Sequence, residues 1–567
     1  MCIRDRFLIA LSLSFAVQAD ILNRNSIIHP AVGDSGMVVT QHYLATEVGQ
    51  AILKKGGNAV DASVAVAFAL AVVLPRAGNI GGGGFMVLHN AAEKKNYAID
   101  YREMAPAAAY RDMYLNEDGS VNKSTSRLGY LSGGIPGTVA GMWEAHQKFG
   151  ALPWKELIAP AIKLAQDGFR VSPFMADSIN RAYASMKDYP SSVEVFFPEY
   201  PLKPNHNLIQ KDLASTLKRI ARYGKDGFYK GKTAKIFAEA MKNNNGLITE
   251  DDLLNYKAVW REPLESSYKD FQIVSMPPPS SGGVHLIQML NILDNFDLKK
   301  LGHNSKDYIL LLTETMKYAY ADRSKYLGDP DFYDVPVKQL VDKAYASVIA
   351  KDIQLGITTP ANDIFPGEKL PTEGMETTHF SVSDKYGNTV SNTYTINSSY
   401  GAKVVMEGLG FLLNNEMDDF AAAPGIPNQF GLLGGEANKI EPNKRPLSSM
   451  TPSIVFLDEK PFLVTGSPGG SRIISTVLQM ILNVVEFNME VSDATIQPRI
   501  HHQWKPDVLG IEAGLNPEVI NLLNTTNQDI YIHSPGTSLE SIVLKNNYHY
   551  GFGDTRRPDS LALGSND

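Results

Sequence analysis

Residues 376–397 read ETTHFSVSDKYGNTVSNTYTIN, and this stretch decides the fold. Polar and apolar residues alternate over 380–383 and again over 389–397, and the residues between them have the composition of a turn. Alternation on both sides of a short turn predicts a β-hairpin. Thr377 therefore lies at the origin of the first strand, directly after Glu376.

This position makes Thr377 a candidate nucleophile. A threonine hydroxyl needs an adjacent base, and a threonine that becomes a chain N-terminus carries that base as its own α-amine. Cleavage of the bond between Glu376 and Thr377 would create such an N-terminus. A threonine pair before a strand is also ordinary β-strand composition. The hairpin alone leaves both interpretations open.

Bulk composition is that of a globular protein. The chain has 567 residues, of which 44% are hydrophobic and 20% charged. This length predicts about two to four structural units with a large buried core. The net charge is -8, so the chain lacks the excess of basic residues that is typical of a nucleic-acid-binding protein. We therefore expect no nucleic-acid partner.

The first nineteen residues resemble a secretory signal peptide. An apolar run covers residues 7–17 and is followed by Val17-Gln18-Ala19, which suits a signal peptidase. The run is too short to span a bilayer comfortably. We expect a periplasmic or secreted protein without a stable membrane anchor, although the acidic Asp5 is unusual in a leader.

Cysteine and histidine usage argues against metal or thiol chemistry. The only cysteine, Cys2, lies within the expected leader, so the mature chain would contain no disulfide. No Cys/His cluster has metal-ligand spacing, and His501 and His502 cannot both face one ion from a strand. We expect no cofactor and no metal, with both histidines at the surface or behind the site.

Alternating helices and strands are predicted near the N-terminus. A strand at 37–39 is followed by helices at 45–54 and 59–74, and the second helix is apolar on all sides, which indicates burial. Four glycines, 81–84, precede a strand at 85–88. Because they do not open a helix and lack the Lys-Ser/Thr of a phosphate loop, we expect tight backbone packing there.

The remaining chain divides near residues 360–374, which are rich in turn-forming residues. The segment 152–370 is predicted to be mostly helical. Beyond the hairpin, strands are predicted at 453–457 and 462–465, and a helix at 473–484. Central antiparallel strands flanked by helices predict layered sheets covered on both faces.

An acyl transfer by Thr377 would need N–H groups that stabilise the developing oxyanion. Gly469 and Gly470 lie in a predicted turn between a strand and a helix. Since neither has a Cβ, their backbone can approach a ligand closely. The pair is also typical of a plain turn, so it supports the nucleophile only together with other groups.

A substrate clamp is the second requirement. Arg102 could bind a carboxylate through its forked guanidinium, and Asp419 could accept from an ammonium group. Hydroxyls of Ser448 and Ser449 could bond the same carboxylate. Each residue alone is also typical of a surface ion pair or a turn. Together they would select a free α-amino acid group.

Taken with the motifs around them, these residues make the chain strongly resemble the γ-glutamyltransferase family, whose members are also called glutathione hydrolases. The resemblance runs from about Gly36 to the end of the chain. It rests on six motifs in order: PGTVAG (136–141), SSGG (280–283), TTHFSV (377–382), NNEMDDF (414–420), KRPLSSM (444–450) and GSPGGSR (466–472).

The resemblance implies an N-terminal-nucleophile hydrolase with an αββα sandwich. It implies a precursor that cuts itself between Glu376 and Thr377 into a large subunit, 20–376, and a small subunit, 377–567, which pair as a heterodimer. Thr377 would take the γ-glutamyl group from glutathione or another γ-glutamyl compound and pass it to water, an amino acid or a dipeptide.

The resemblance also assigns roles residue by residue. Thr395 matches the threonine that hydrogen-bonds the nucleophile, and Gly469 with Gly470 matches the oxyanion hole. The γ-glutamyl pocket is matched by Arg102, Asn397, Glu416, Asp419, Ser448 and Ser449.

Three features depart from the family pattern. Residues 424–435 have the length of the lid loop of many bacterial members, with Phe430 where a tyrosine often occurs. Glu416 replaces a glutamine of some bacterial relatives, and residues 1–6 match nothing expected.

Three other functions are considered. A cephalosporin (glutaryl) acylase and a poly-γ-glutamate depolymerase share the scaffold, but acylases usually present serine rather than Thr377. An unprocessed, inactive binding protein is disfavoured by the complete set of catalytic residues.

Overall fold

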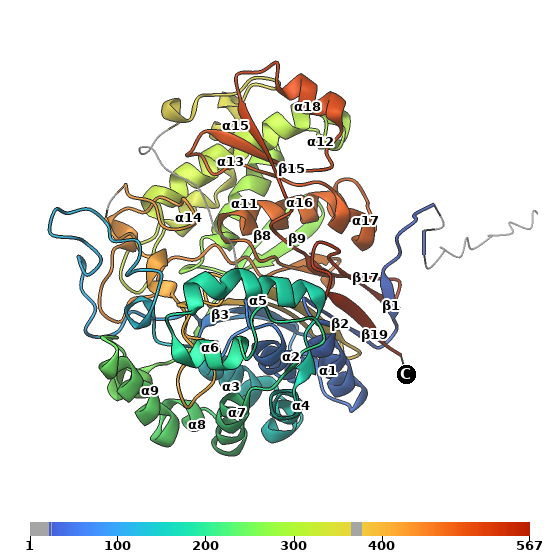
Figure 1. Cartoon of the computed structure of the whole chain (residues 1–567). Coiled ribbons are helices and arrows are strands. Elements are labelled where there is room, and N and C mark those ends of the chain that lie inside the picture. The colour runs from blue at the N-terminus through green and yellow to red at the C-terminus, as the bar shows by residue number, and fades with distance from the viewer. Residues whose placement is uncertain (1–21, 24, 365–376, 424, 567) are drawn as a thin grey trace, which may run out of the picture.

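Two antiparallel sheets lie face to face, with helices on both outer sides (Figure 1). The structure is a computed structural model that describes residues 22–23, 25–364, 377–423 and 425–566. The expected signal peptide, Glu376 and most of the turn-rich boundary lie outside the described residues.

The predicted hairpin forms the centre of the first sheet. Its strands β10 and β11 pair antiparallel with Thr378 opposite Tyr394, which confirms the alternation seen in the sequence. The seven strands in spatial order are β19 (Leu561–Ser565), β2 (Gly36–Thr40), β10 (Thr378–Asp384), β11 (Thr389–Thr395), β3 (Gly83–Asn90), β4 (Lys95–Tyr101) and β7 (Val259–Arg261).

The second sheet contains the two later strands that the sequence predicted, β12 and β13, and five that it did not. Its order is β1 (Ala31–Gly33), β18 (Tyr548–Gly553), β17 (Glu540–Lys545), β13 (Lys460–Thr465), β12 (Ser453–Leu457), β9 (Phe271–Ser275) and β8 (Leu264–Tyr268). The segment 152–370 is therefore not wholly helical. Strands β8 and β9 are short and lie at one sheet edge, so their alternation is too brief to distinguish them from loops.

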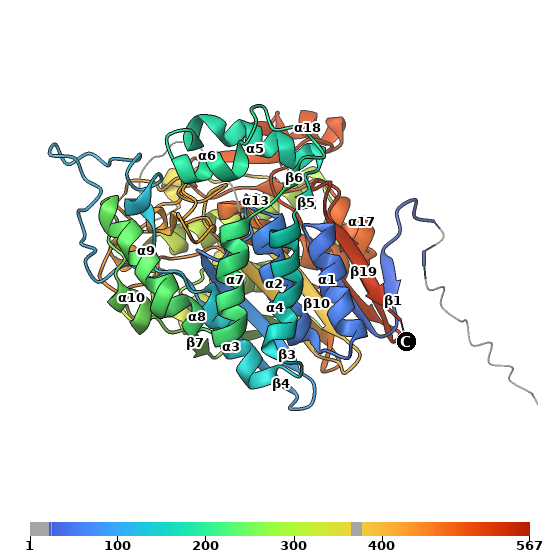
Figure 2. The ribbon, with the colours of Figure 1, turned by 60° about the horizontal axis from the view of Figure 1, so that its bottom comes forward.

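Helices complete a four-layer αββα sandwich. One outer layer contains α1 (Tyr43–Lys54), α2 (Ala59–Val73), α3 (Thr138–Phe149), α4 (Trp154–Asp167) and α7 (Lys211–Tyr223), which cover the first sheet (Figure 2). The opposite layer contains α11 (Gly282–Leu293), α13 (Lys306–Tyr326), α15 (Lys343–Asp352) and α16 (Ile473–Val485). This arrangement confirms the predicted fold class.

Further helices and short strands surround these layers. The helices are α5 (Pro173–Met186), α6 (Pro190–Phe196), α8 (Asp226–Tyr229), α9 (Gly231–Asn243), α10 (Glu250–Asn255), α12 (Leu298–Leu301), α14 (Val337–Leu340), α17 (Val491–Ile496) and α18 (Pro517–Leu523). The strands are β5 (Phe169–Arg170), β6 (Asn207–Leu208), β14 (Ile500–His501), β15 (Val508–Glu512) and β16 (Asp529–His533). Two single-turn 3-10 helices, η3 (Glu416–Asp419) and η5 (Gly470–Arg472), carry predicted site residues.

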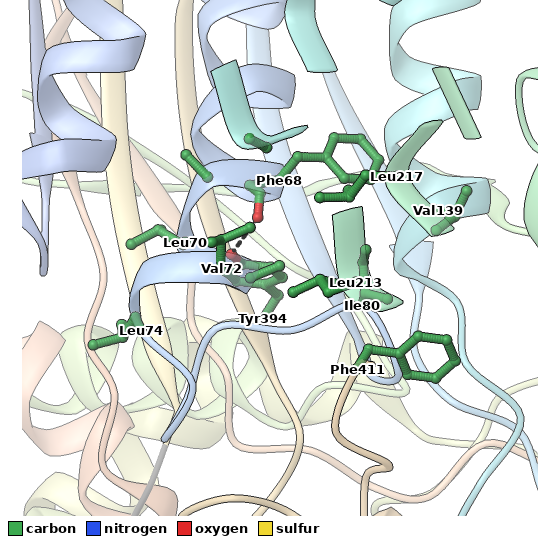
Figure 3. Close-up of a cluster of buried hydrophobic side chains, with 14 of the residues drawn as sticks. Phe68, Leu70, Val72, Leu74, Ile80, Val139, Leu213, Leu217, Tyr394 and Phe411 are labelled. Carbon is green, nitrogen blue, oxygen red and sulfur yellow. Dashed lines mark hydrogen bonds between the residues drawn. The ribbon is translucent and has the colours of Figure 1, made fainter. Parts of the chain in front are cut away.

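Helix α2 is the core of the first helical layer. Asn58 and Asp61 form a capping box at its start, and every residue of the helix is buried. Figure 3 shows its apolar side chains, including Phe68 and Leu70, packed near Tyr394 of β11. The Tyr394 hydroxyl donates to the Ala67 carbonyl at 3.0 Å. Packing and hydrogen bond together hold the end of β11 against the helix.

Strand β10 directs alternate side chains to the two sides of its sheet. Phe380 and Val382 belong to the core under the helices, whereas Ser381 donates to the Glu540 carbonyl of the other sheet at 2.7 Å. His379 contacts Thr393 Oγ1 at 2.8 Å on that same inner side. Because the side-chain period of a strand is two, Thr377 continues the inner row of His379 and Ser381.

Candidate active site

Thr377 lies opposite Thr395 at the end of the hairpin. The register that pairs Thr378 with Tyr394 places these two threonines across from each other, and their Oγ1 atoms are 3.4 Å apart. Thr395 Oγ1 also accepts from the Asn397 backbone N–H at 2.8 Å. Both side chains are nearly buried. The Thr395 hydroxyl is thereby held within reach of the Thr377 hydroxyl.

The glycine run beside β3 supports this strand end. A Cβ on Gly82 would lie 2.0 Å from the Thr395 carbonyl oxygen, so only glycine fits. Asn79 donates its amide to the same carbonyl at 3.0 Å. The expected tight backbone packing is therefore present, and it fixes the position of Thr395.

Arg102 is the centre of a buried charge cluster. It directly follows β4, and its guanidinium forms ion pairs with Glu416 and Asp419, both on η3. Its Nε also donates to the Pro446 carbonyl at 3.2 Å. Glu103 Oε2 lies 3.6 Å from Arg102 Nη1. The guanidinium is thus held rigidly, with several carboxylates competing for it.

Burial makes these carboxyl groups weak acids. It raises the pKa of Glu416 well above its ordinary value and that of Glu103 to about 7, although Arg102 opposes both shifts. Burial would lower the pKa of Arg102, but Glu416 and Asp419 raise it, so the guanidinium stays charged. The cluster therefore favours keeping a proton on a carboxyl group near neutral pH.

Two buried acceptors of residues that line one pocket with Arg102 have no hydrogen-bond partner within the described part of the chain: Glu416 Oε2 and Asn397 Oδ1. The Asn397 amide donates to the Asn415 carbonyl at 2.8 Å, which leaves its Oδ1 as the free end. A buried acceptor without a donor is costly. Both atoms could accept from an ammonium group that enters the pocket.

Ser448 and Ser449 line the same pocket from the loop before β12. Ser448 Oγ accepts from the Met450 N–H at 3.1 Å, and Ser449 Oγ accepts from Arg323 Nη2 at 3.2 Å. Sequence analysis missed Arg323. The helical periodicity could have indicated this residue: Arg323 follows Ala319 of α13 by four residues, and so belongs to the buried face of that helix.

Gly469 and Gly470 have backbone conformations that favour glycine, with φ of 131° and 54°. A Cβ on Gly470 would lie 2.6 Å from the Phe430 ring. Gly470 lines the pocket and begins η5, which leads into α16. The pair thus forms a tight turn beside Thr377, where backbone groups can approach a reacting carbonyl.

The predicted lid covers the pocket. Phe430 is only 5% exposed and packs against Gly470. Gln503, another residue that sequence analysis missed, donates its amide to the carbonyls of Phe430 at 3.3 Å and Gly431 at 3.1 Å. Asn428 donates to Asp419 Oδ1 at 3.2 Å. Hydrogen bonds therefore connect the lid segment both to Gln503 and to Asp419 of the pocket lining.

These residues line one partly open pocket. It brings together ten of the predicted site residues, and Gly469 adjoins it. The lining consists of Arg102, Arg323, Thr377, Thr395, Asn397, Glu416, Asp419, Phe430, Leu432, Ser448, Ser449, Met450, Gly470 and Ile473.

In the described ranges, no group of three His, Cys, Asp or Glu side chains could hold a metal ion. His501 and His502 are buried rather than at the surface: His501 contacts Ser475 and His502 contacts Asp507. None of the described helices has the length and apolar character that crossing a membrane requires.

Comparisons with known proteins identify the family of this chain. The sequence model of the gamma-glutamyltranspeptidase family matches residues 45–564. The glutathione hydrolase proenzyme of Escherichia coli K12 is 48% identical over 556 residues, which cover 97% of this chain and 94% of that protein. The acylase ACY 1 proenzyme of Pseudomonas sp. V22 is 39% identical over 506 residues, covering 87% of each.

Among solved structures, the cephalosporin acylase of Bacillus halodurans superposes with a TM-score of 0.84 at 24% sequence identity. The match covers 97% of this chain and 99% of that one. At this identity the likeness establishes the sandwich fold alone.

Proposed function

Because this chain belongs to the gamma-glutamyltranspeptidase family, we propose that it is a glutathione hydrolase and γ-glutamyltransferase with Thr377 as its nucleophile. One observation carries the proposal. The Thr377 hydroxyl lies beside Thr395 in a pocket that also holds Arg102, a buried cation suited to a carboxylate.

The reaction proceeds in two steps. Thr377 Oγ1 attacks the γ-carbonyl carbon of the donor, and its proton passes to the α-amine that becomes available once Thr377 is a chain N-terminus. That proton then goes to the leaving amine as the C–N bond breaks, which leaves a γ-glutamyl ester on Thr377. Water or the amine of an acceptor attacks this ester and restores the hydroxyl.

Oxyanion stabilisation is assigned to the turn at Gly469 and Gly470. Backbone N–H groups placed before reaction stabilise a developing oxyanion without reorganising during the step. Thr395 holds the Thr377 hydroxyl in position for attack.

Donor recognition uses both charges of the glutamyl group. Arg102, Ser448 and Ser449 bind the α-carboxylate, while Asp419 with the free acceptors of Glu416 and Asn397 binds the α-ammonium. The α-carboxylate competes with Asp419 and Glu416 for the Arg102 guanidinium. The ammonium compensates those carboxylates when it binds, so the total charge of the pocket is unchanged.

Activity requires processing of a precursor. The Thr377 hydroxyl attacks the carbonyl carbon of Glu376, and the acyl group moves from the Thr377 nitrogen to its oxygen as the C–N bond breaks. Water then hydrolyses this ester, giving a large subunit, 20–376, and a small subunit, 377–567, that remain paired. Residues 1–19 act as a signal peptide that directs the protein to the periplasm or the exterior.

Acylase activity is the second candidate, supported by the 39% identity to the acylase proenzyme. A glutaryl donor has no α-ammonium. It would leave Asp419 and the unpartnered acceptors of Glu416 and Asn397 uncompensated, which favours a γ-glutamyl donor.

Incubation of the purified precursor, followed on a denaturing gel and by release of p-nitroaniline from γ-glutamyl-p-nitroanilide, tests the proposal. Wild type is expected to form two bands and to release product, and Thr377→Ala to do neither. A single wild-type band after long incubation, or turnover by Thr377→Ala, would contradict it. Glutaryl-p-nitroanilide in place of the γ-glutamyl compound distinguishes the acylase alternative.

A further inference from the structure

Arg323 is a buried cation that no described carboxylate contacts directly, and the charge of Asp419 acts on it from beyond ion-pair distance. Its side chain is almost wholly buried, yet no described carboxylate forms an ion pair with it. Its hydrogen bonds go only to hydroxyls: Nε donates to Ser281 Oγ at 3.0 Å and Nη2 to Ser449 Oγ at 3.2 Å. Burial lowers the pKa of Arg323 to about 10, so it remains charged at neutral pH. A buried charge without an anion in direct contact is costly and requires an explanation.

The hydrogen bond to Ser449 determines which way its hydroxyl proton points. An arginine has donors only, so Ser449 Oγ must accept from Arg323. Its own proton has no acceptor in the described part of the chain, although Ser449 lines the pocket. The Ser449 hydroxyl is therefore a donor available to a ligand.

The serine is also held in place by its neighbours. Ser281, the other partner of Arg323, donates its hydroxyl to the Ser448 carbonyl at 2.7 Å and its backbone N–H to the same oxygen at 2.8 Å. Ser280 Oγ donates to the Met450 carbonyl at 2.6 Å. The loop at 280–281 and the loop at 448–450 thus form one rigid unit with Arg323 between them.

We propose that Arg323 is a positioning residue for the α-carboxylate of the donor, acting through Ser449. By occupying one lone pair of Ser449 Oγ, it turns the hydroxyl proton away from itself and toward the pocket, and it adds a second buried positive charge to the pocket that Arg102 lines. This inference rests on the proposed γ-glutamyl donor and assigns a specificity determinant within it. A donor group without the α-carboxylate gains nothing from this arrangement.

Competitive inhibition by L-glutamate and by its decarboxylated analogue, 4-aminobutyrate, tests this role, with γ-glutamyl-p-nitroanilide turnover as the reporter. In Arg323→Gln we expect the inhibition constant of L-glutamate and the KM of the reporter to rise about tenfold or more. This is the effect expected when a charge-assisted hydrogen bond is lost. The constant for 4-aminobutyrate and kcat are expected to change less than about twofold.

A double-mutant cycle separates action through Ser449 from a general effect. If Arg323 acts through that hydroxyl, Arg323→Gln adds little to the L-glutamate constant once Ser449→Ala is present. Lys317→Gln is the matched control. Lys317 is a buried cation on the same helix, but it pairs with Glu314 and does not line the pocket. It should lower thermal stability without changing the ratio of the two inhibition constants.

Equal weakening of both inhibitors by Arg323→Gln, or additive effects of Arg323→Gln and Ser449→Ala, would overturn the inference. If Arg323→Gln does not fold or process, Arg323→Lys provides the same readout, because lysine keeps the charge but loses the fork to Ser281 and Ser449. Absence of wild-type turnover would instead refute the proposed function itself.

Discussion

Thr377 and Thr395 face each other across the β10–β11 hairpin, with 3.4 Å between their hydroxyl oxygens. Their separation of eighteen residues follows from antiparallel pairing in which Thr378 is opposite Tyr394. The backbone N–H of Asn397 donates to Thr395 Oγ1, which holds this oxygen at its place opposite Thr377. The hairpin itself thus aligns the proposed nucleophile.

Thr395→Val should slow both self-cleavage and turnover. Valine keeps the shape but removes the hydroxyl, and the loss of one hydrogen bond corresponds to roughly a 2- to 10-fold decrease in rate. Gel densitometry of the precursor and kcat for γ-glutamyl-p-nitroanilide measure the two effects. Thr389→Val is the control, because Thr389 lies on the same strand with a buried hydroxyl that has no partner among the described residues. Equal rates in Thr395→Val and wild type would remove Thr395 from the mechanism.

Arg102→Lys should weaken donor binding more than it slows chemistry. Lysine keeps the charge but cannot pair with Glu416 and Asp419 at once, as the guanidinium does. We expect KM to rise by about 10- to 100-fold, corresponding to roughly 1.4–3 kcal/mol, and Tm to fall.

Arg261→Lys is the control for Arg102→Lys. Arg261 bridges Asp100 and Asp331, each at 2.8 Å, and does not line the pocket. It should lower Tm and leave KM unchanged. A similar KM in both variants would show that Arg102 does not contact the donor.

Gln503→Leu should loosen the lid. Gln503 donates to the carbonyls of Phe430 and Gly431, and leucine fills the same space without these donors. We expect KM to rise by about 3- to 10-fold because a lid that opens more often releases the donor faster, while self-cleavage keeps its normal rate. Steady-state kinetics together with gel analysis of processing check this. A loss of processing without a change of KM would place Gln503 in maturation instead.

The two proposed subunits should remain together after cleavage without a covalent link. Strand β2 would belong to the large subunit, yet it pairs with β10 and β19 of the small subunit. The chain has a single cysteine, so no disulfide can join the pieces. We expect one peak in native size-exclusion chromatography and two only after unfolding in denaturant. Separation of the pieces in native buffer would contradict the shared sheet.

Glu540 should make stability depend on pH. Its carboxylate is fully buried, neither oxygen has a hydrogen-bond partner within the described residues, and burial raises its pKa from 4.5 to about 8. Because the folded pKa is the higher one, its contribution to stability is complete below about pH 4.5 and is lost as pH rises through about 8.

Glu540→Gln cannot ionise, so its Tm relative to wild type should increase by a few degrees between about pH 5 and pH 9. Thermal unfolding at both pH values measures the difference, and other buried carboxyls contribute equally to both proteins. A Tm difference that is constant with pH would show that Glu540 titrates normally.

Local patterns predicted much of the fold. The alternation over 380–397 corresponds to β10 and β11, and the continuous apolar run at 59–74 to the buried helix α2. Both patterns depend on side-chain periodicity within one element, which is visible in a single stretch of sequence. Strands β8 and β9 were missed because five residues at a sheet edge carry too little periodicity.

The sequence by itself determined which residue types are available: a threonine at a strand origin, paired glycines in a turn, and motifs that identify the family. Only the tertiary structure decided how distant residues combine. Arg102 and Asp419 are 317 positions apart and form one buried ion pair, and Arg323 of α13 reaches Ser449 in the loop before β12. Secondary structure follows from local periodicity, whereas such pairings depend on how whole layers pack, and no local pattern encodes that packing.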